Sequence, residues 1–203
     1  SFSADAYLNE VGITNRLLPE ENTSLGRLVA PFDTVADPED TDDDIEVFAR
    51  FMRATKAPAI DVAGANHPDA RAGGQIFNQI GCAICHVPAI PTARPGTVIN
   101  GGAFVVPPAL GGKIIHPFGD FLLHDVGTGD GIVQNGGQET ANKMRTAPLW
   151  GLRARNRYMH DGASLTLEDA IRRHRGEAAA VMGRFNQIPE RQRAQLIQFL
   201  RSL

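Results

Sequence analysis

Five consecutive residues, Cys82-Ala83-Ile84-Cys85-His86, carry the most specific chemistry in this sequence. The pattern C-x-x-C-H is the attachment signature of c-type haem. Two thiols three positions apart can each add to one vinyl group of the porphyrin. The histidine that follows is then held beneath the ring, where its imidazole can bind the iron. We therefore predict one covalent haem c, attached through Cys82 and Cys85, with His86 as an axial ligand of the iron.

Other uses of paired cysteines fit this chain less well, and one of them stays open. A structural zinc site takes four nitrogen or sulfur ligands, usually as two such pairs, and the chain has no third cysteine. A thioredoxin-like C-x-x-C lies near a βαβ pattern, and none is apparent here. A chain made without haem would keep both thiols free, or would hold a metal ion with Cys82, Cys85 and His86. An apo or metal-binding chain is therefore an alternative.

The second axial ligand decides what such a haem can do. Histidine on both faces gives a low-potential electron carrier, methionine on one face raises the potential, and an open face permits peroxide or oxygen chemistry. The candidates are His67, His116, His124, His160, His174, Met52, Met144, Met159 and Met182. We expect His174, because it falls on the apolar face of a predicted helix that is otherwise rich in charge. Met144, in a loop-like stretch after a Gly-rich segment, is the second choice.

The elements that must position these residues are mostly helices. Apolar residues recur at helical spacing over Ile45–Met52, Asp69–Ile80, Leu167–His174 and Pro189–Leu203. Acidic residues at 42–44 are expected to cap the first of these helices, and Thr166 the third. The helix over Asp69–Ile80 ends directly before Cys82, so it delivers the attachment motif.

Residues 87–142, roughly, are heavy in Gly and Pro and separate the motif from the C-terminal helices. Within them Ala103–Val106 and Lys113–His116 are strand-sized runs around Gly111-Gly112, which we expect to pair as a short β-hairpin. Residues 1–42 are polar and turn-rich. We predict a mainly α, cytochrome c-like haem domain over 59–203 with this long loop excursion. Residues 1–58 are then the tail of a preceding domain or an arm packed on the haem domain.

Composition narrows the partners and the compartment. A net charge of −3 and a pI near 6.1 give no reason to propose a nucleic-acid partner. No apolar run approaches the ~20 residues that a membrane span needs. Because haem is attached to apocytochromes outside the cytoplasm in bacteria, we expect a periplasmic or otherwise exported protein.

Three further motifs follow one another in an order that resembles a known family. They are Arg145-Thr146-Ala147-Pro148-Leu149-Trp150-Gly151-Leu152, Tyr158-Met159-His160-Asp161-Gly162 and Thr166-Leu167-Glu168-Asp169-Ala170-Ile171. Together they resemble the C-terminal haem domain of the bacterial dihaem cytochrome c peroxidase superfamily. Leu122-Leu123-His124-Asp125-Val126-Gly127 and His174-Arg175-Gly176-Glu177-Ala178 are similar to its branch of dihaem oxidoreductases, also described as thiol oxidoreductases.

This resemblance implies an electron-transferring haem whose partner is a second haem domain in a longer parent, or a separate electron donor or acceptor protein. It also implies that His174 stands where the peroxidases have a methionine ligand. The family's enzymes need two haems, whereas this sequence has a single C-x-x-C-H, so the reacting haem of a peroxidase-like oxidoreductase would lie outside the chain. Calcium binds between the two domains of related peroxidases, but no acidic cluster at metal-ligand spacing is evident.

Electron transfer through a haem held by His86 and His174 is thus the leading hypothesis. The alternative is a haem enzyme with an open or displaceable iron face, acting on peroxide or thiol substrates. In that case His160 and Asp161 are the candidate catalytic residues, because such chemistry requires a group that accepts and returns a proton. Glu177 or Arg145 would assist them.

Overall fold

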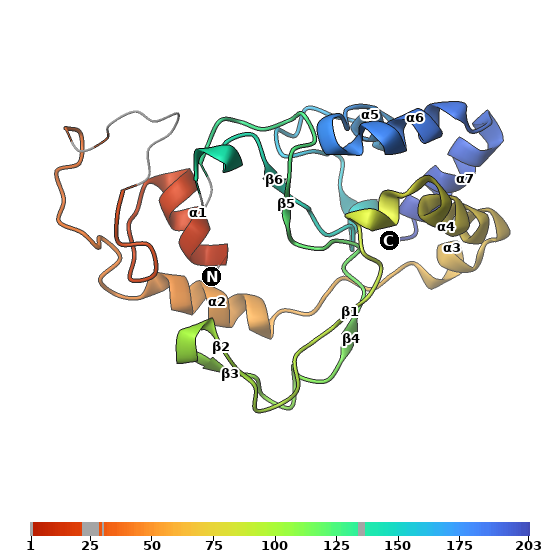
Figure 1. Cartoon of the computed structure of the whole chain (residues 1–203). Coiled ribbons are helices and arrows are strands. Elements are labelled where there is room, and N and C mark those ends of the chain that lie inside the picture. The colour runs from red at the N-terminus through yellow and green to blue at the C-terminus, as the bar shows by residue number, and fades with distance from the viewer. Residues whose placement is uncertain (1, 22–28, 30, 134–136) are drawn as a thin grey trace. The chain divides into compact units, whose positions relative to one another are not determined.

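The computed structural model of the chain describes residues 2–21, 29, 31–133 and 137–203. The chain divides into two compact units, and Figure 1 shows their elements. The N-terminal unit comprises 1–56, 94–111 and 129–143, and the C-terminal unit comprises 57–93, 112–128 and 144–203. The first boundary lies within two residues of the one expected after residue 58. Two stretches of the Gly/Pro-rich segment, expected in the haem domain, instead belong to the N-terminal unit.

The N-terminal unit contains α1 (Phe2–Val11), α2 (Asp44–Ala54), β2 (Val98–Ile99), β3 (Phe104–Val105) and the 3₁₀ turns η3 (Asn100–Gly102) and η4 (Gln138–Thr140). The helix α1 corrects the expectation of a turn-rich start. It packs on α2, where Ala4 and Leu8 of α1 and Ile45 and Ala49 of α2 are buried. Because α1 buries only Ala4 and Leu8 among its described side chains, the apolar periodicity of residues 2–11 is weak.

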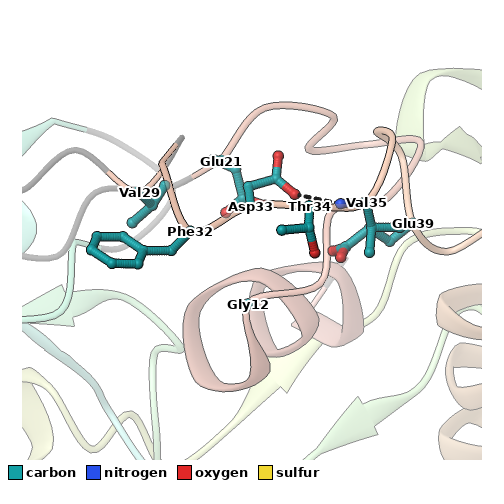
Figure 2. A pocket seen from close by; sticks show the side chains of 8 residues that line it. All are labelled: Gly12, Glu21, Val29, Phe32, Asp33, Thr34, Val35 and Glu39. Carbon is teal, nitrogen blue, oxygen red and sulfur yellow. Dashed lines mark hydrogen bonds between the residues drawn. The ribbon is translucent and has the colours of Figure 1, made fainter.

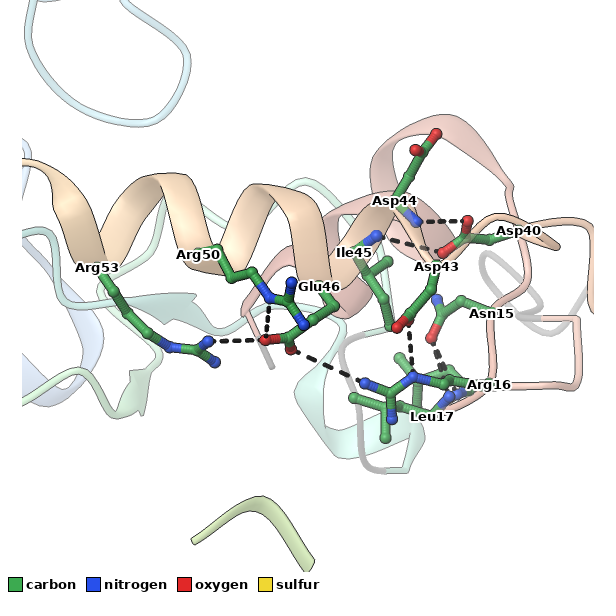
Figure 3. A network of polar contacts seen from close by, with 11 residues as sticks. Asn15, Arg16, Leu17, Asp40, Asp43, Asp44, Ile45, Glu46, Arg50 and Arg53 are labelled. Atoms are coloured by element: carbon green, nitrogen blue, oxygen red, sulfur yellow. Dashed lines mark hydrogen bonds and ion pairs between the residues drawn. The ribbon is translucent and has the colours of Figure 1, made fainter. Parts of the chain in front are cut away.

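The start of α2 differs in detail from the expected cap. Asp40, rather than one of the acidic residues at 42–44, accepts hydrogen bonds from the backbone N–H groups of Asp44 (2.9 Å) and Ile45 (3.3 Å). Asp43 occupies the N-cap position without a side-chain cap bond. Its carboxylate instead accepts a bond from Nε of Arg16 at 2.7 Å (Figure 3). Carboxylates at the first turn satisfy free N–H groups and favour the helix dipole.

The apolar stripe predicted on α2 is only partly buried. Ile45 and Ala49 lie in the core, whereas Phe48, Phe51 and Met52 are at least half exposed within the described residues. One contact of the exposed side is the ring of Phe48 against that of Tyr7, with centroids 5.9 Å apart. The stripe is therefore wider than the face that α2 packs against α1.

A small open pocket of the N-terminal unit gathers carboxylates (Figure 2). Glu21, Asp33 and Glu39 line it, together with the exposed ring of Phe32. Burial, reinforced by the neighbouring carboxylates, raises the pKa of Glu21. Oxygens of Glu21, Asp37 and Glu39 lie within 4.8 Å of one another, so the fold brings together an acidic cluster that the sequence spacing did not reveal.

In the described part of the chain the strands form three two-residue antiparallel pairs, and this corrects the predicted hairpin. Both predicted strands exist, but they do not pair with each other. Phe104–Val105 pairs with Val98–Ile99 across η3, while β4 (Ile114–Ile115) pairs with β1 (Ile90–Pro91). The third pair joins β5 (Leu123–His124) to β6 (Met144–Arg145). The short β-hairpin is thus β2–β3, and the other two pairs join residues at least 20 positions apart.

The C-terminal unit contains α3 (Val62–Asn66), α4 (Pro68–Ile80), α5 (Leu167–Arg172), α6 (Ala179–Gln187) and α7 (Glu190–Leu200), with η2 (Cys82–Ile84), η5 (Leu152–Ala154) and η6 (Gly176–Ala178). The predicted helices over Asp69–Ile80 and from Pro189 are confirmed. Their buried apolar residues form one core: Ile76, Phe77, Ile80, Leu152, Leu167, Phe185, Leu196, Leu200 and Leu203. The structure is mainly helical, as predicted, with small antiparallel strand pairs.

Helices α4 and α7 make the most extensive contact of this unit and lie side by side in Figure 1. Their backbones approach closely at Gly73, where an added Cβ would lie 2.0 Å from the carbonyl oxygen of Gln195. The glycine therefore permits the crossing that anchors α4. Within the described residues, no helix combines the length and apolar character that crossing a bilayer requires.

Candidate functional site

The C-terminal end of α4 presents the C-x-x-C-H motif. The helix begins with His67 as N-cap and Pro68 at its first position, and ends at Gly81, whose φ of 95° lies in the left-handed region. A Cβ there would also lie 2.7 Å from a guanidinium nitrogen of Arg184. Nε of that arginine donates to the carbonyl oxygen of Ile80 at 2.7 Å. Gly81 and Arg184 thus end the helix sharply and turn the chain into the motif.

The two cysteines lie on one helical turn. Cys82–Ile84 is a 3₁₀ turn, and the N–H of His86 donates to the carbonyl oxygen of Cys82 at 3.0 Å. Residues three apart on such a turn lie on the same side of it. Both thiols are free, and burial raises their pKa values, that of Cys82 to about 11. They are therefore protonated near neutral pH, unlike the thiolates of a zinc or redox site.

His86 has its imidazole oriented by the backbone. Its Nδ1 lies 3.0 Å from the carbonyl oxygen of Phe118, and a carbonyl can only accept, so Nδ1 carries the proton. Phe118 itself has a φ of 51°, an uncommon value for a non-glycine residue that turns its carbonyl toward the histidine. Burial lowers the pKa of His86 to about 4. The ring is thus neutral near pH 7, with the lone pair of Nε2 available to a metal ion.

His174 also has its Nδ1 hydrogen-bonded to a backbone carbonyl, but this carbonyl belongs to the helix that precedes it. Helix α5 starts with the predicted cap, Thr166 accepting from the N–H of Asp169, but it ends at Arg172. His174 therefore follows the helix instead of lying on its face. Its half-buried ring folds back, and Nδ1 donates to the carbonyl oxygen of Ala170 at 2.9 Å. One of the last carbonyls of the helix thereby holds the proton on Nδ1 and leaves Nε2 as the nitrogen that can bind a metal ion.

The structure brings these two histidines together. Their ring centroids are 6.4 Å apart, with an angle of 61° between the ring planes. With metal–nitrogen bonds of about 2.0–2.1 Å and ring nitrogens roughly 1.1 Å from the ring centre, two imidazoles on opposite sides of one ion have centres about 6.3 Å apart. The observed spacing therefore matches two axial ligands of a single iron.

An aromatic cluster packs beside His86. The ring of Phe77 lies 6.3 Å from that of His86 and 6.1 Å from that of Phe118, and both phenylalanines also contact Phe199. These contacts connect α4, the loop after the motif and α7. The donor set fits a c-type haem: two protonated thiols on one turn, a neutral histidine directly after them, and a second histidine at the spacing of a shared ion.

The other predicted site residues have different surroundings. Met144 lies half-buried in β6, opposite His124 of β5. His160 is exposed in the turn before Gly162. Both oxygens of Asp161 bind the guanidinium of Arg173, at 2.9 and 2.5 Å. Hydrogen bonds from Arg173 and from the N–H of Ala163 lower the pKa of Asp161 well below its usual range, which makes it a poor proton acceptor.

Sequence reasoning missed one group of polar residues beside the motif. Cys85, Asp120 and His124 each bring a potential ligand atom within 4.8 Å of the other two. Glu177 joins them through a 2.8 Å contact with Nδ1 of His124. In the sequence, Leu122–Gly127 stands out only through its resemblance to the dihaem oxidoreductases. Asp120 and His124 lie four residues apart outside any helix, so no periodicity pointed to their contact.

This donor set fits a haem-binding redox protein, and comparison with protein families agrees. A family model described as "Di-haem oxidoreductase, putative peroxidase" matches residues 2–203. The chain therefore belongs to the di-haem oxidoreductase family. No significant match is found among curated proteins.

One solved structure that matches part of the chain is hydrazine synthase of Kuenenia stuttgartiensis, determined under xenon pressure. It has 20% sequence identity and a TM-score of 0.49, and the match covers 86% of the present chain. The match covers 59% of the solved chain, so the present chain spans less than two thirds of that neighbour.

Proposed function

We propose that the C-terminal unit, residues 57–93, 112–128 and 144–203, is a c-type cytochrome domain that transfers electrons within a di-haem oxidoreductase. Cys82 and Cys85 would attach the porphyrin through thioether bonds, and Nε2 of His86 and of His174 would bind the iron from its two faces. The observation that carries this proposal is the 6.4 Å spacing of the two imidazole rings.

The protonation states of the protein groups support the same assignment. Each Nδ1–H is donated to a backbone carbonyl, at Phe118 for His86 and at Ala170 for His174. Such outer hydrogen bonds fix the tautomer and raise the basicity of a ligating imidazole. Burial keeps His86 neutral near pH 7, so a metal ion need not displace a proton from it.

A haem held in this way supplies a one-electron ferric/ferrous couple, with a potential set by its axial ligands and surroundings. The contribution of the chain is to hold both ligands still during the change of oxidation state. Phe77, which is 2% exposed, excludes water beside His86. The hydrogen bond that His174 donates to the carbonyl oxygen of Ala170 restrains rotation of the His174 ring. A coordination sphere that changes little costs little reorganisation, and that favours rapid electron transfer.

The partner is an electron donor or acceptor, either a protein or a second haem domain of a longer parent. Family membership supports the second haem. An exported, periplasmic location follows from the requirement for haem attachment outside the cytoplasm. The enzymatic alternative, an open iron face served by His160 and Asp161, has less support, because the carboxylate of Asp161 is already bound by Arg173.

Optical spectra test the ligand assignment. Protein made with haem-attachment machinery is expected to retain haem after denaturation and to give narrow low-spin bands when oxidised and reduced. His174→Ala should become high-spin, whereas the matched variant Met144→Ala should keep the wild-type bands. Low-spin bands that persist in His174→Ala and vanish in Met144→Ala would assign the second ligand to Met144 instead. Haem lost on denaturation would refute covalent attachment.

A further inference from the structure

His124 lies between two carboxylates of the C-terminal unit. Its Nε2 is 2.9 Å from an oxygen of Asp120, and its Nδ1 is 2.8 Å from an oxygen of Glu177. The side chains of Asp120 and His124 are 13% and 19% exposed, whereas that of Glu177 is 49% exposed. The three groups, here called the Asp120–His124–Glu177 cluster, thus lead from solvent into the unit.

The geometry of this cluster specifies a protonation state. A neutral imidazole donates from only one nitrogen, and ionised carboxylates only accept. Both short contacts are hydrogen bonds only when the ring carries two protons. The bond to Glu177, followed by that to Asp120, raises the pKa of His124 against the opposing effect of burial. The imidazolium form is therefore the one that the surroundings stabilise.

Both carboxylates are held in place by the backbone. The second oxygen of Glu177 accepts from the N–H of Asp125 at 3.0 Å, and the second oxygen of Asp120 accepts from the N–H of Leu122 at 2.9 Å. At the adjacent Gly176, an added Cβ would lie 2.4 Å from the carbonyl oxygen of Asp125. The cluster is thus built by close packing of two loops.

The cluster adjoins the proposed haem attachment. Sγ of Cys85 lies within 4.8 Å of ligand atoms of Asp120 and His124. Asp120 also follows Phe118 by two residues, and the carbonyl of Phe118 accepts the Nδ1–H of His86. The charge on the cluster therefore acts on both the second thioether position and the environment of the first axial ligand.

The remaining ionisable neighbours lie on the surrounding loops and strands. Asp125 and Arg145 are on or next to the β5–β6 pair, and the side chain of Arg175 packs against Gly127. The two carboxylates meet opposite edges of the imidazole ring, so an ion bound to either nitrogen would meet only one of them.

We propose that the Asp120–His124–Glu177 cluster is a proton-binding site coupled to the redox state of the haem. If the haem held at the proposed site gained one electron from an electron-donor protein, the neutral fraction of His124 would take up one proton from the buffered solvent by way of the exposed Glu177. When the electron leaves, the proton returns to water. The electron added to the haem stabilises the imidazolium of His124. For a Coulomb interaction that solvent partly screens, we expect the proton affinity of His124 to rise roughly tenfold. This inference rests on the proposed haem site.

The test is the midpoint potential of the haem-loaded protein measured from about pH 5 to pH 9, the range in which histidine titrates. The wild-type potential should fall with rising pH over a bounded interval. His124→Gln should lose this dependence, and Glu177→Gln should move it to lower pH. The control His116→Gln, at an exposed histidine, should retain it. In addition, ¹⁵N NMR should report a higher His124 pKa in reduced than in oxidised protein.

The two proposals fail in distinguishable ways. Absence of low-spin covalent haem would refute the haem site. Low-spin haem with a pH-independent potential, or with the same dependence in both cluster variants, would overturn the coupled proton site alone. If His124→Gln fails to load haem, Glu177→Gln and the NMR titration still test the proposal. Coupling would be contradicted if Glu177→Gln left the pH range of the potential change where it is in wild type. Equal pKa values of His124 in oxidised and reduced protein would also contradict it.

Discussion

Replacing Gly73 by alanine tests the crossing of α4 and α7 that supports the C-x-x-C-H motif. A Cβ at Gly73 would lie 2.0 Å from the carbonyl oxygen of Gln195 and 2.8 Å from Cβ of Phe199. Carbon atoms pack at about 3.5–4.0 Å, so the two helices would have to separate by more than about 1 Å. Both obstructing groups belong to the body of α7, and a side-chain rotation cannot relieve the contact.

The neighbouring Gly74 provides a matched control. A Cβ there would meet ring carbons of Phe199 at 3.4 Å, an ordinary contact. Both glycines lie inside α4, so each substitution gains the same helix propensity of about 0.8–1.0 kcal/mol. The difference between the variants is therefore the overpacking term, about 1–3 kcal/mol or somewhat more. Gly74→Ala should be neutral or stabilising, and Gly73→Ala should be the less stable of the two by that amount.

Urea unfolding followed by far-ultraviolet circular dichroism measures this difference. Gly183→Ala in α6, where an added Cβ has no neighbour within 4 Å, reports the propensity gain by itself. Equal unfolding midpoints for Gly73→Ala and Gly74→Ala would show that α4 and α7 do not approach each other as closely as the structure has them.

Two further predictions concern charged groups of the C-terminal unit. Asp161→Asn should raise the high-spin fraction of the haem without abolishing low-spin bands, because the clamp on Arg173 lies next to His174; unchanged spectra would show that this ion pair plays no part in holding the ligand. His124 should add stability at low pH: its pKa is raised on folding, so its contribution is complete below the unfolded value of about 6.5 and is lost as pH rises through the higher folded pKa. Thermal midpoints from pH 5 to about pH 9 should therefore fall less steeply in His124→Gln than in wild type, and parallel curves would contradict this.

Helices that bury several large apolar residues could be predicted from the sequence, whereas helices that bury few could not. α4 and α7 carry large residues at core spacing, including Phe77 and Leu196, and both formed where expected. α6 buries only Phe185, so its sequence carries little periodicity. α5 was recognised from its cap, but its end two residues before His174 depends on how the chain turns toward Val126, whose carbonyl accepts from the N–H of Arg175.

The pairing of the strands could not be predicted from local sequence patterns, because two of the three pairs in the described residues join segments far apart in the sequence. Ile114–Ile115 was recognised as a strand, yet its partner begins 24 residues earlier, at Ile90. For the candidate ligands too, some could be predicted from the sequence and others depend on the fold. C-x-x-C-H could be read directly, and His174 followed from resemblance and position. The contact of His124 with Asp120 and Glu177 needs two loops that only the folded chain brings together.

Electron paramagnetic resonance of the ferric protein tests the central claim most directly, because it reports the axial ligands of the iron itself. Wild-type protein with covalent haem should give the low-spin signal of two imidazoles, and His174→Ala should replace it with a high-spin signal. A wild-type signal that is high-spin, or a low-spin signal unaffected by loss of His174, would contradict the assignment of His86 and His174 as the two ligands.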